Sequence, residues 1–293
     1  MTFKHTPVLL QSVIDSLNIT PGGKYIDATL GGGGHTRQIL EKGGIVLGID
    51  QDIDAINFVA ESLKEYISEN KLVVTQGNFR DIKEIANENG FGTVSGIMFD
   101  LGVSSYQLDT AERGFSIKND EHLDMRMDRE TELTAYDVVN TYSIEALSDI
   151  FMRYGEEDKA VVAAEKIAEQ RKIKKIETTG DLIKVIEMVI KRQGMRHPAT
   201  QIFQAIRIEV NDELKAIKEG LAGGIELLDA EGVLSVISFH SLEDRISKQL
   251  FSNWETQRLG KIVTNKPIIA DANEMSSNPR ARSAKLRVFK KTI

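Results

Sequence analysis

Short apolar runs and amphipathic stretches alternate along the first hundred residues. The apolar runs have the length of strands and occupy residues 24–29, 45–50, 72–75 and 94–100, and the stretches between them have helical composition. Strands that alternate with helices predict βαβ units and a parallel sheet. The strand residues are apolar almost without interruption, which is typical of a sheet covered by helices on both faces.

The pattern changes after Asp100. Residues 101–130 are irregular and rich in charge, whereas residues 135–194 have helical character, most clearly at 157–171 and 178–193. Thr178 and Asp181 have the spacing of a helix start, and Gly194 marks a helix end. We therefore predict a helical domain inserted into the chain that forms the sheet.

Sheet-type elements return after the insertion. Residues 203–221 place apolar side chains at spacings of three and four, which predicts one long amphipathic helix with Thr200 as its N-cap. A buried strand at 232–238 and a last strand at 284–289 follow. The expected organisation is an α/β domain in two parts, residues 1–108 and 200–293, around a helical insertion at residues 109–199.

Composition excludes several classes of protein. The 293 residues include no cysteine, which excludes disulfides and thiolate metal sites, and the five histidines are scattered, so we predict no metal. No apolar run approaches the roughly 20 residues that span a bilayer, and the N-terminus lacks a signal-peptide core. We therefore expect a soluble cytoplasmic protein with no membrane partner.

Charge is distributed unevenly along the chain. The net charge of −7 argues against a protein that coats nucleic acid indiscriminately. Residues 278–293 nevertheless contain no acidic residue, and their cations are Arg280, Arg282, Lys285, Arg287, Lys290 and Lys291. This basic tail is compatible with a local phosphate-binding surface.

A glycine loop joins the first predicted strand to a helix. Residues 27–35 read Asp-Ala-Thr-Leu-Gly-Gly-Gly-Gly-His, and such glycines let backbone N–H groups and a helix N-terminus approach a ligand closely. Asp50 ends the second strand, where an acid accepts hydrogen bonds from ribose hydroxyls in such folds. We expect a ligand that contains adenosine or a similar group, although a turn without a ligand would use the same glycines.

Two common nucleotide fingerprints do not fit this loop. The dinucleotide pattern Gly-x-Gly-x-x-Gly/Ala ends on Thr36 when it starts at Gly31 and on Arg37 when it starts at Gly32, and no Gly-Lys-Ser/Thr is present. Four consecutive glycines with Asp27 at the strand end favour S-adenosylmethionine. A nicotinamide-dependent oxidoreductase and a non-catalytic nucleotide-binding factor remain the alternatives.

Polar motifs follow the fourth and fifth strands. Asp100 begins the sequence Asp-Leu-Gly-Val-Ser-Ser, with Gln107 just beyond it, and His240 lies in Ser-Phe-His-Ser-Leu-Glu-Asp-Arg. Ligands of doubly wound sheets bind at the carboxyl ends of the strands. Asp100 is therefore a candidate for contacting substrate or cofactor, and His240 for contacting a base or phosphate. A turn or cap for Asp100 and an ordinary hydrogen-bonding role for His240 are the alternatives.

A series of motifs covers nearly the whole chain and resembles one family. In order, the motifs are residues 4–10, 31–35, 100–105, 112–116, 123–128, 154–157, 197–207, 238–245 and 278–283. Together they resemble the MraW/RsmH family of bacterial small-subunit (16S) ribosomal RNA cytosine-N4 methyltransferases. The resemblance implies a class I, Rossmann-like methyltransferase sheet with an inserted all-helical domain, in agreement with the pattern above.

The resemblance also implies a cofactor, a substrate and their contact residues. S-adenosylmethionine would be held by Gly33, Gly34, His35, Asp50, Phe79, Asp100 and Gln107, with the Phe79 ring packed on adenine. The substrate would be a cytosine in the decoding centre of small-subunit ribosomal RNA, within the assembled or assembling subunit, and the enzyme would be a homodimer. Since RNA is read by splaying a base out and gripping phosphates, we expect the base near Asp100, Ser104 and His240. The phosphates would lie along Arg113, Arg126, Arg196, Arg280 and Arg282, although structural ion pairs are an alternative for Arg113 and Arg126.

One departure bears on the mechanism. Methyltransferases that act on exocyclic amino groups commonly carry Asp/Asn-Pro-Pro-Tyr/Phe after the fourth strand, whereas this chain reads Asp100-Leu-Gly-Val. The usual catalytic role therefore does not transfer. Our hypothesis is that positioning dominates, with Asp100 orienting or polarising the amino group.

Overall fold

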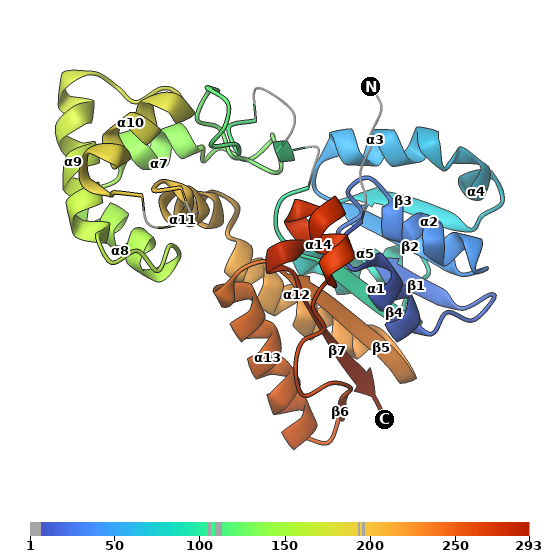
Figure 1. Cartoon of the computed structure of the whole chain (residues 1–293). Helices are drawn as coiled ribbons and strands as arrows, with labels where there is room; N and C mark the ends of the chain where they lie inside the picture. The colour runs from blue at the N-terminus through green and yellow to red at the C-terminus, as the bar shows by residue number, and fades with distance from the viewer. Residues whose placement is uncertain (1–6, 105–106, 109–112, 193, 195–196, 293) are drawn as a thin grey trace. The chain divides into compact units, whose positions relative to one another are not determined.

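The chain folds into two compact units. The computed structural model describes residues 7–104, 107–108, 113–192, 194 and 197–292 (Figure 1). The sheet unit comprises Met1–Ser104 and Leu214–Ile293, and the helical unit comprises Ser105–Glu213. Among the described residues, no helix combines the length and apolar character needed to cross a membrane.

In the described part of the chain, seven strands form one sheet in the order β3-β2-β1-β4-β5-β7-β6. Strands β1 to β5 run parallel, and β7 is antiparallel to both of its neighbours. The strands are β1 Lys24–Asp27, β2 Ile45–Asp50, β3 Leu72–Gln76, β4 Val94–Asp100, β5 Leu228–Ser238, β6 Gly260–Ile262 and β7 Lys285–Lys291. The order reverses between β1 and β4, which is the switch point where doubly wound sheets bind ligands.

Helices cover both faces of the sheet, as the continuous apolar strands predicted (Figure 1). One face carries α1 Leu10–Leu17, α2 Gly34–Glu41 and α3 Ile53–Ser62, and the other carries α5 Ile82–Glu88, α12 Glu213–Leu227 and α13 Ser241–Thr256. Shorter elements complete the unit: α4 Lys64–Ser68, η1 Phe79–Asp81, α14 Ala272–Ser277 and η2 Pro279–Ser283.

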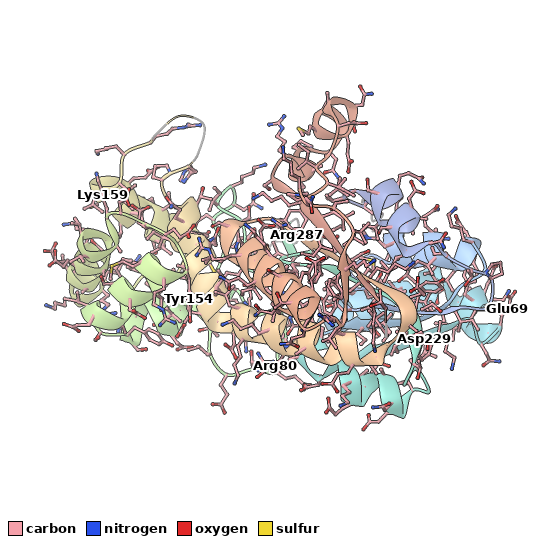
Figure 2. The ribbon with its side chains drawn as sticks, turned by 90° about the horizontal axis from the view of Figure 1, so that it is seen from below. Glu69, Arg80, Tyr154, Lys159, Asp229 and Arg287 are labelled. Atoms are coloured by element: carbon pink, nitrogen blue, oxygen red, sulfur yellow. The ribbon has the colours of Figure 1, made fainter. Side chains whose placement is uncertain are left out.

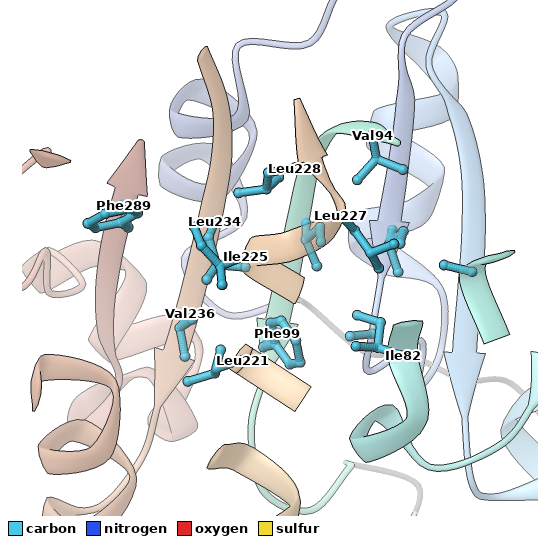
Figure 3. Packing of buried hydrophobic residues seen from close by; sticks show 14 of the residues in the cluster. Ile82, Val94, Phe99, Leu221, Ile225, Leu227, Leu228, Leu234, Val236 and Phe289 are labelled. Carbon is cyan, nitrogen blue, oxygen red and sulfur yellow. The ribbon is translucent and has the colours of Figure 1, made fainter. Parts of the chain in front are cut away.

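Each face of the sheet has its own hydrophobic core. The core beneath α12 and α13 includes Phe99, Leu221 and Phe289 (Figure 3). The core on the opposite face includes Val13 and Ile39. None of these five side chains is exposed to solvent. Burial of one such side chain stabilises the fold by about 1.5–3 kcal/mol. The two cores fix the strand ends that carry the polar residues.

The helical unit contains α7 Ala135–Thr141, α8 Ile144–Arg153, α9 Ala160–Ile173, α10 Thr179–Val189 and α11 Thr200–Asn211. Side-chain caps set several of its helix starts. The hydroxyls of Thr134, Ser143 and Thr178 accept backbone N–H bonds at the starts of α7, α8 and α10. Such a cap contributes roughly 1 kcal/mol. The helix start predicted at Thr178 and Asp181 is therefore confirmed.

The helical unit is wider than the insertion expected at 109–199, because it begins at Ser105, ends at Glu213 and includes α11. Helix α11 packs on α7 and α8, so its apolar face is used within the helical unit. The predicted single helix over 203–221 is wrong: Asp212 has φ 48° and separates α11 from α12. The predicted N-cap at Thr200 is also wrong, since Ala199 holds that position without a side-chain bond. An apolar repeat continues across such a break, so periodicity does not reveal it.

The aromatic cluster on β7 and α13 predicts a large loss of stability on truncation. The Phe289 ring lies 5.3 Å from the Phe251 ring and 5.5 Å from the Trp254 ring, measured between centroids. Phe289→Ala should lower the free energy of unfolding by about 3–5 kcal/mol in urea denaturation. Val263→Ala is the control, because Val263 is 53% exposed and its truncation should change stability by less than about 0.5 kcal/mol. Equal losses for the two variants would contradict the packing described.

Candidate active site at the carboxyl edge of the sheet

Aspartates end three neighbouring strands of the sheet. Asp50 is the last residue of β2, Asp27 of β1 and Asp100 of β4. Asp27 pairs in register with Gly48 of β2 and Met98 of β4. Because the strands are parallel, the three carboxyl groups lie at one edge of the sheet, at the switch point between β1 and β4.

The glycine loop is fixed by bonds to the end of β2. The Gly31 N–H donates to Asp50 Oδ2 at 2.8 Å, and the Leu30 N–H donates to the Ile49 carbonyl at 2.9 Å. The Gly33 N–H closes the turn on the Leu30 carbonyl at 2.7 Å. Gly31 (φ 49°) and Gly33 (φ 71°) both have left-handed backbones, which glycine adopts without strain. The side chain of Asp50 thus holds the loop that the sequence predicted to bind the cofactor.

Close packing also requires glycine at the downstream end of the loop. A Cβ atom on Gly33 would lie 2.9 Å from Val59 Cγ2, and one on Gly34 would lie 2.2 Å from Pro7 Cγ. Both distances are shorter than normal van der Waals contact. The fold therefore explains Gly33 and Gly34 by itself, and their contact with the cofactor stays a prediction.

Burial shifts the pKa of the first two aspartates. Asp27 is 1% exposed; burial raises its pKa to about 6, although Thr36 Oγ1 and the Thr29 N–H donate to its carboxylate. Burial of the Asp50 carboxyl likewise raises its pKa to about 6, against the bonds from the Asp52 and Gly31 N–H groups. Each carboxylate oxygen has a second lone pair, so Asp50 can still accept a bond from a ribose hydroxyl.

Asp100 has the largest shift of the three. Burial, together with the negative charges of Asp27 and Glu243, raises its pKa to about 8. Its N–H donates to Thr29 Oγ1 at 2.6 Å, which fixes the backbone at the strand end. Its buried Oδ1 atom has no hydrogen-bond partner among the described residues. A buried acceptor without a partner is costly for a fold and is typical of a functional site.

Glu243 is a site residue that the sequence reasoning did not single out. It is 0% exposed, and its Oε2 accepts the Phe239 N–H at 2.7 Å and the His240 N–H at 3.2 Å. His240 is the N-cap of α13 and forms a capping box with Glu243. In the sequence, only the spacing of three residues between His240 and Glu243 in the motif 238–245 indicated this cap. His240 thus has a structural role as this cap, and its contact with a base or phosphate stays a prediction.

The other predicted ligand residues have varied environments. His35 is 5% exposed, and its Nε2 lies 3.1 Å from the Val8 carbonyl oxygen. Phe79 follows β3 and packs edge-on against Phe99, with ring centroids 5.6 Å apart. Ser104 Cβ lies 4.0 Å from the position of a Cβ on Gly31, which brings Ser104 beside the glycine loop. Gln107 is buried and belongs to the helical unit.

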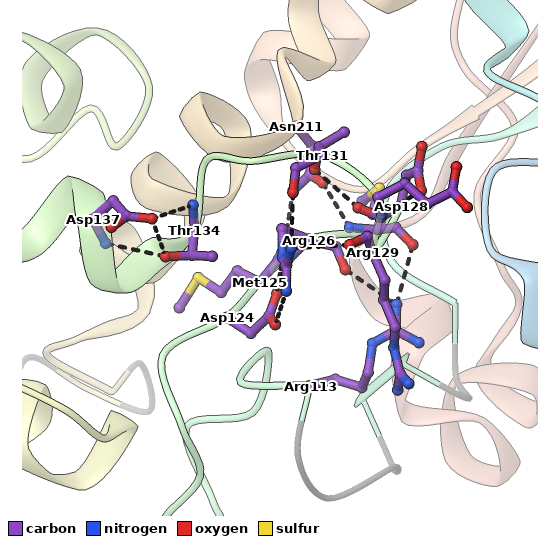
Figure 4. Close-up of polar contacts among 12 residues, drawn as sticks. Arg113, Asp124, Met125, Arg126, Asp128, Arg129, Thr131, Thr134, Asp137 and Asn211 are labelled. Atoms are coloured by element: carbon purple, nitrogen blue, oxygen red, sulfur yellow. Dashed lines mark hydrogen bonds and ion pairs between the residues drawn. The ribbon is translucent and has the colours of Figure 1, made fainter.

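Arg113 and Arg126 have structural partners in the helical unit (Figure 4). Arg113 is 1% exposed, and its guanidinium donates to the carbonyls of Arg126 and Met127. Arg126 makes two bonds to the Asp124 carboxylate, at 2.9 and 2.8 Å, and its Nη1 donates to two further carbonyls. These bonds favour the structural alternative over phosphate binding, because the donors that would grip a phosphate are already used.

Three of the six cations of the basic tail pair with acidic residues of the sheet unit among the described residues. Arg287, labelled in Figure 2, makes a bidentate pair with Asp244 at 2.6 and 3.1 Å, and Lys285 lies 3.5 Å from the same carboxylate. Lys290 pairs with Glu231 at 2.6 Å. The predicted phosphate contacts Arg280 and Arg282 lie on η2, where Arg282 is exposed. Arg196 lies outside the described residues.

Comparison with known proteins identifies one family. The model of the MraW methylase family matches residues 2–292. Ribosomal RNA small subunit methyltransferase H of Brevibacillus brevis is 44% identical to this chain over 99% of both chains. The protein of the same name from Streptococcus pyogenes serotype M4 is 47% identical over 99% of this chain and 98% of its own. This chain aligns over its whole length with a solved rRNA methylase from Streptococcus thermophilus, over the whole of that chain, at 9% identity and a TM-score of 0.48.

The raised pKa of Asp100 predicts a pH-dependent contribution to stability. The folded protein holds the Asp100 proton up to a pKa of about 8, whereas the ordinary pKa of an aspartate is 3.8. The stability that this proton confers is complete below pH 3.8 and is lost as the pH rises to about 8. Asp100→Asn cannot ionise, so its free energy of unfolding should rise relative to wild type between pH 5 and pH 8.

Urea denaturation of the ligand-free proteins at several pH values would measure this difference. Asp229→Asn, at an exposed position, is the control for the loss of one negative charge. A difference between Asp100→Asn and wild type that stays constant with pH would rule out the proposed burial of the Asp100 proton.

Proposed function

The chain belongs to the MraW methylase family, and from this we propose that it methylates the exocyclic N4 of a cytosine in the decoding centre of small-subunit ribosomal RNA. The enzyme is an S-adenosylmethionine-dependent methyltransferase of small-subunit ribosomal RNA. This assignment sets aside the oxidoreductase and the non-catalytic binding factor. The observation that carries the proposal for the N4 group is the buried Oδ1 of Asp100 at the end of β4, which has no hydrogen-bond partner among the described residues.

The carboxyl edge of the sheet suits a positively charged ligand. None of the ion pairs among the described residues involves Asp27, Asp50 or Asp100, so these three carboxyl groups have no cation beside them there. S-adenosylmethionine carries a sulfonium cation and, when bound, supplies an electrophilic methyl group. We propose that it is held by Gly33, Gly34, His35, Asp50, Phe79, Asp100 and Gln107.

The surroundings of Asp100 support a role in which its carboxylate acts on an amino group. The lone pair of a cytosine amino group is delocalised into the ring, which makes the nitrogen a poor nucleophile. An acceptor for the amino N–H bonds favours a tetrahedral nitrogen and holds the group in line with the methyl carbon. Asp100 Oδ1 is such an acceptor, because it is buried and the Asp100 backbone is fixed by Thr29. The same oxygen can take the proton that the nitrogen loses on methylation.

We propose that the RNA contacts the strand ends of the sheet and η2. The target base would lie near Asp100, Ser104 and His240, and Arg280 and Arg282 would contact phosphates from η2. The family resemblance extends the proposal to RNA in the assembled or assembling small subunit and to a homodimeric enzyme. Sedimentation of the purified protein would test the dimer.

Transfer of labelled methyl groups to undermethylated small subunits tests the activity, and mass mapping of the product identifies the nucleotide. We expect one cytosine of the decoding centre to gain a methyl group on N4. A label on another nucleotide, or on a ribose or ring carbon, would overturn the proposed target. Parallel assays with deproteinised RNA would show whether the assembled subunit is required.

Asp100→Ala separates a role in chemistry from a role in cofactor binding. Loss of the acceptor should reduce kcat at saturating S-adenosylmethionine by about 10²–10⁴-fold, and calorimetry should show a smaller loss of affinity for S-adenosylmethionine, because Asp100 is also proposed to help hold this ligand. Asp229→Ala, at an exposed position, should leave both quantities unchanged. If affinity and turnover fall together, Asp100 is mainly a cofactor ligand.

Charge reversal on η2 tests the phosphate contacts. The double variant Arg280→Glu with Arg282→Glu should weaken RNA binding at low salt. The slope of log K against log salt should also become shallower by about one to two units, because fewer counterions leave the RNA when fewer phosphates are contacted. Lys64→Glu with Lys71→Glu is the matched control, at lysines whose side chains are 66% and 48% exposed. An unchanged salt slope in the η2 variant would exclude this surface.

A further inference from the structure

Glu243 is a rigidly held negative charge inside the sheet unit. It lies in the first turn of α13 with none of its surface exposed. Its Oε2 accepts two backbone N–H groups, from Phe239 and His240, and its Oε1 lies 3.1 Å from His240 Nε2. The capping box fixes the position of this carboxylate at the start of α13.

This carboxylate faces the segment that follows Asp100. Oε1 of Glu243 lies 3.7 Å from the position of a Cβ on Gly102, whose backbone is left-handed at φ 88°. The Leu101 N–H donates to the Ile237 carbonyl, which ties this segment to the end of β5. The negative charge of Glu243 raises the pKa of Asp100, and it acts through the protein interior, where charges are screened less than in water.

The charged groups around Asp100 are acidic on both sides. Asp27 faces it from the end of β1 and Glu243 from α13, with His240 beside Glu243. Asp50, at the end of β2, lies next to Asp27 on the side away from Asp100. Among the described residues, no lysine or arginine pairs with Asp27, Asp50 or Asp100. Asp100 is therefore mainly neutral near pH 7 when no positive charge is bound in the site.

We propose that Glu243 is a positioning residue that makes the cofactor site selective for charge, so that Asp100 exchanges its proton for the S-adenosylmethionine cation but keeps it with the neutral product S-adenosylhomocysteine. This inference rests on the proposed placement of Asp100 in the cofactor site. The two ligands differ by one methyl group and one positive charge. The cation favours ionised Asp100, whereas the thioether leaves Asp100 protonated and flanked by Asp27 and Glu243.

The charges balance over one turnover. Binding of the cation releases the Asp100 proton to solvent. In the transfer, the bond from N4 to the methyl carbon forms as the carbon–sulfur bond breaks, with the electron pair going to sulfur. Asp100 Oδ1 takes the proton that N4 loses. The site then holds a neutral carboxyl and a neutral thioether, which is the state that Glu243 favours, and the next cation again displaces the proton.

Calorimetry of the full-length protein measures this exchange without any assay of activity. Titrations with S-adenosylmethionine and with S-adenosylhomocysteine at pH 7, in buffers of different ionisation enthalpy, give the number of protons released by each ligand. We expect close to one proton for the cation and close to none for the product. The affinity for the cation should rise by up to ~10-fold per pH unit between pH 6 and pH 8, while that for the product stays nearly constant. Equal proton release by the two ligands would overturn the inference.

Variants assign the effect to Glu243. Glu243→Gln keeps an oxygen that can accept the Phe239 N–H but removes the charge, so it should release fewer protons and discriminate less between the two ligands. Glu61→Gln is the matched control on an exposed glutamate, 79% exposed, and should behave as wild type. Unchanged proton release in a folded Glu243→Gln protein would refute the role of Glu243.

Asp100→Asn keeps the test decisive if Glu243→Gln does not fold. This variant has no proton to exchange, so it should release none with either ligand, and release that persists would overturn the inference. Absence of any S-adenosylmethionine binding by wild-type protein would instead contradict the cofactor assignment. Binding without a difference in proton release would contradict only the present inference.

Discussion

Asp27, Asp50 and Asp100 lie at one edge of the sheet without a positively charged partner among the described residues, and the rest of the site is built around this arrangement. Parallel pairing of β2, β1 and β4 brings the three strand ends together. Burial then raises the pKa of all three groups, most strongly for Asp100. Asp100 is therefore mainly protonated near pH 7, and the three acids together favour a bound cation. This suits a cofactor whose reactive group is a sulfonium.

The same carboxylates also hold the protein together. Asp50 fixes the glycine loop through the Gly31 N–H, and Asp27 binds Thr36 at the start of α2. Glu243 closes the cap of α13. A residue can thus be part of the binding site and of the fold at once. For this reason, loss of activity in a variant of one of these residues has to be separated from loss of stability.

The arginines of this chain show that the role of a cationic side chain depends on the residues around it in the fold. Arg113 and Arg126 lie in polar, irregular sequence and were candidates for phosphate binding, yet their guanidinium groups are bonded to carbonyls and to Asp124 within the helical unit. Arg287 and Lys285 are neutralised by Asp244 in the same way. The sequence identifies the cationic residues, but their acidic partners come from elsewhere in the chain and are known only from the folded structure.

The sequence by itself determined the class of fold, the glycine loop, the strand-end acids and the family, because these depend on local pattern and on motifs in order. Apolar runs of strand length predicted the covered parallel sheet, and Thr178 with Asp181 predicted a helix start that the structure confirms. Only the tertiary structure decided the break at Asp212, the packing of α11 with the helical unit, and the place of Glu243 beside the segment after Asp100. Each of these depends on contacts between residues far apart in the chain: a periodic pattern shows which face of a helix is apolar, but not what that face packs against, and a buried charge acts on its neighbours in space.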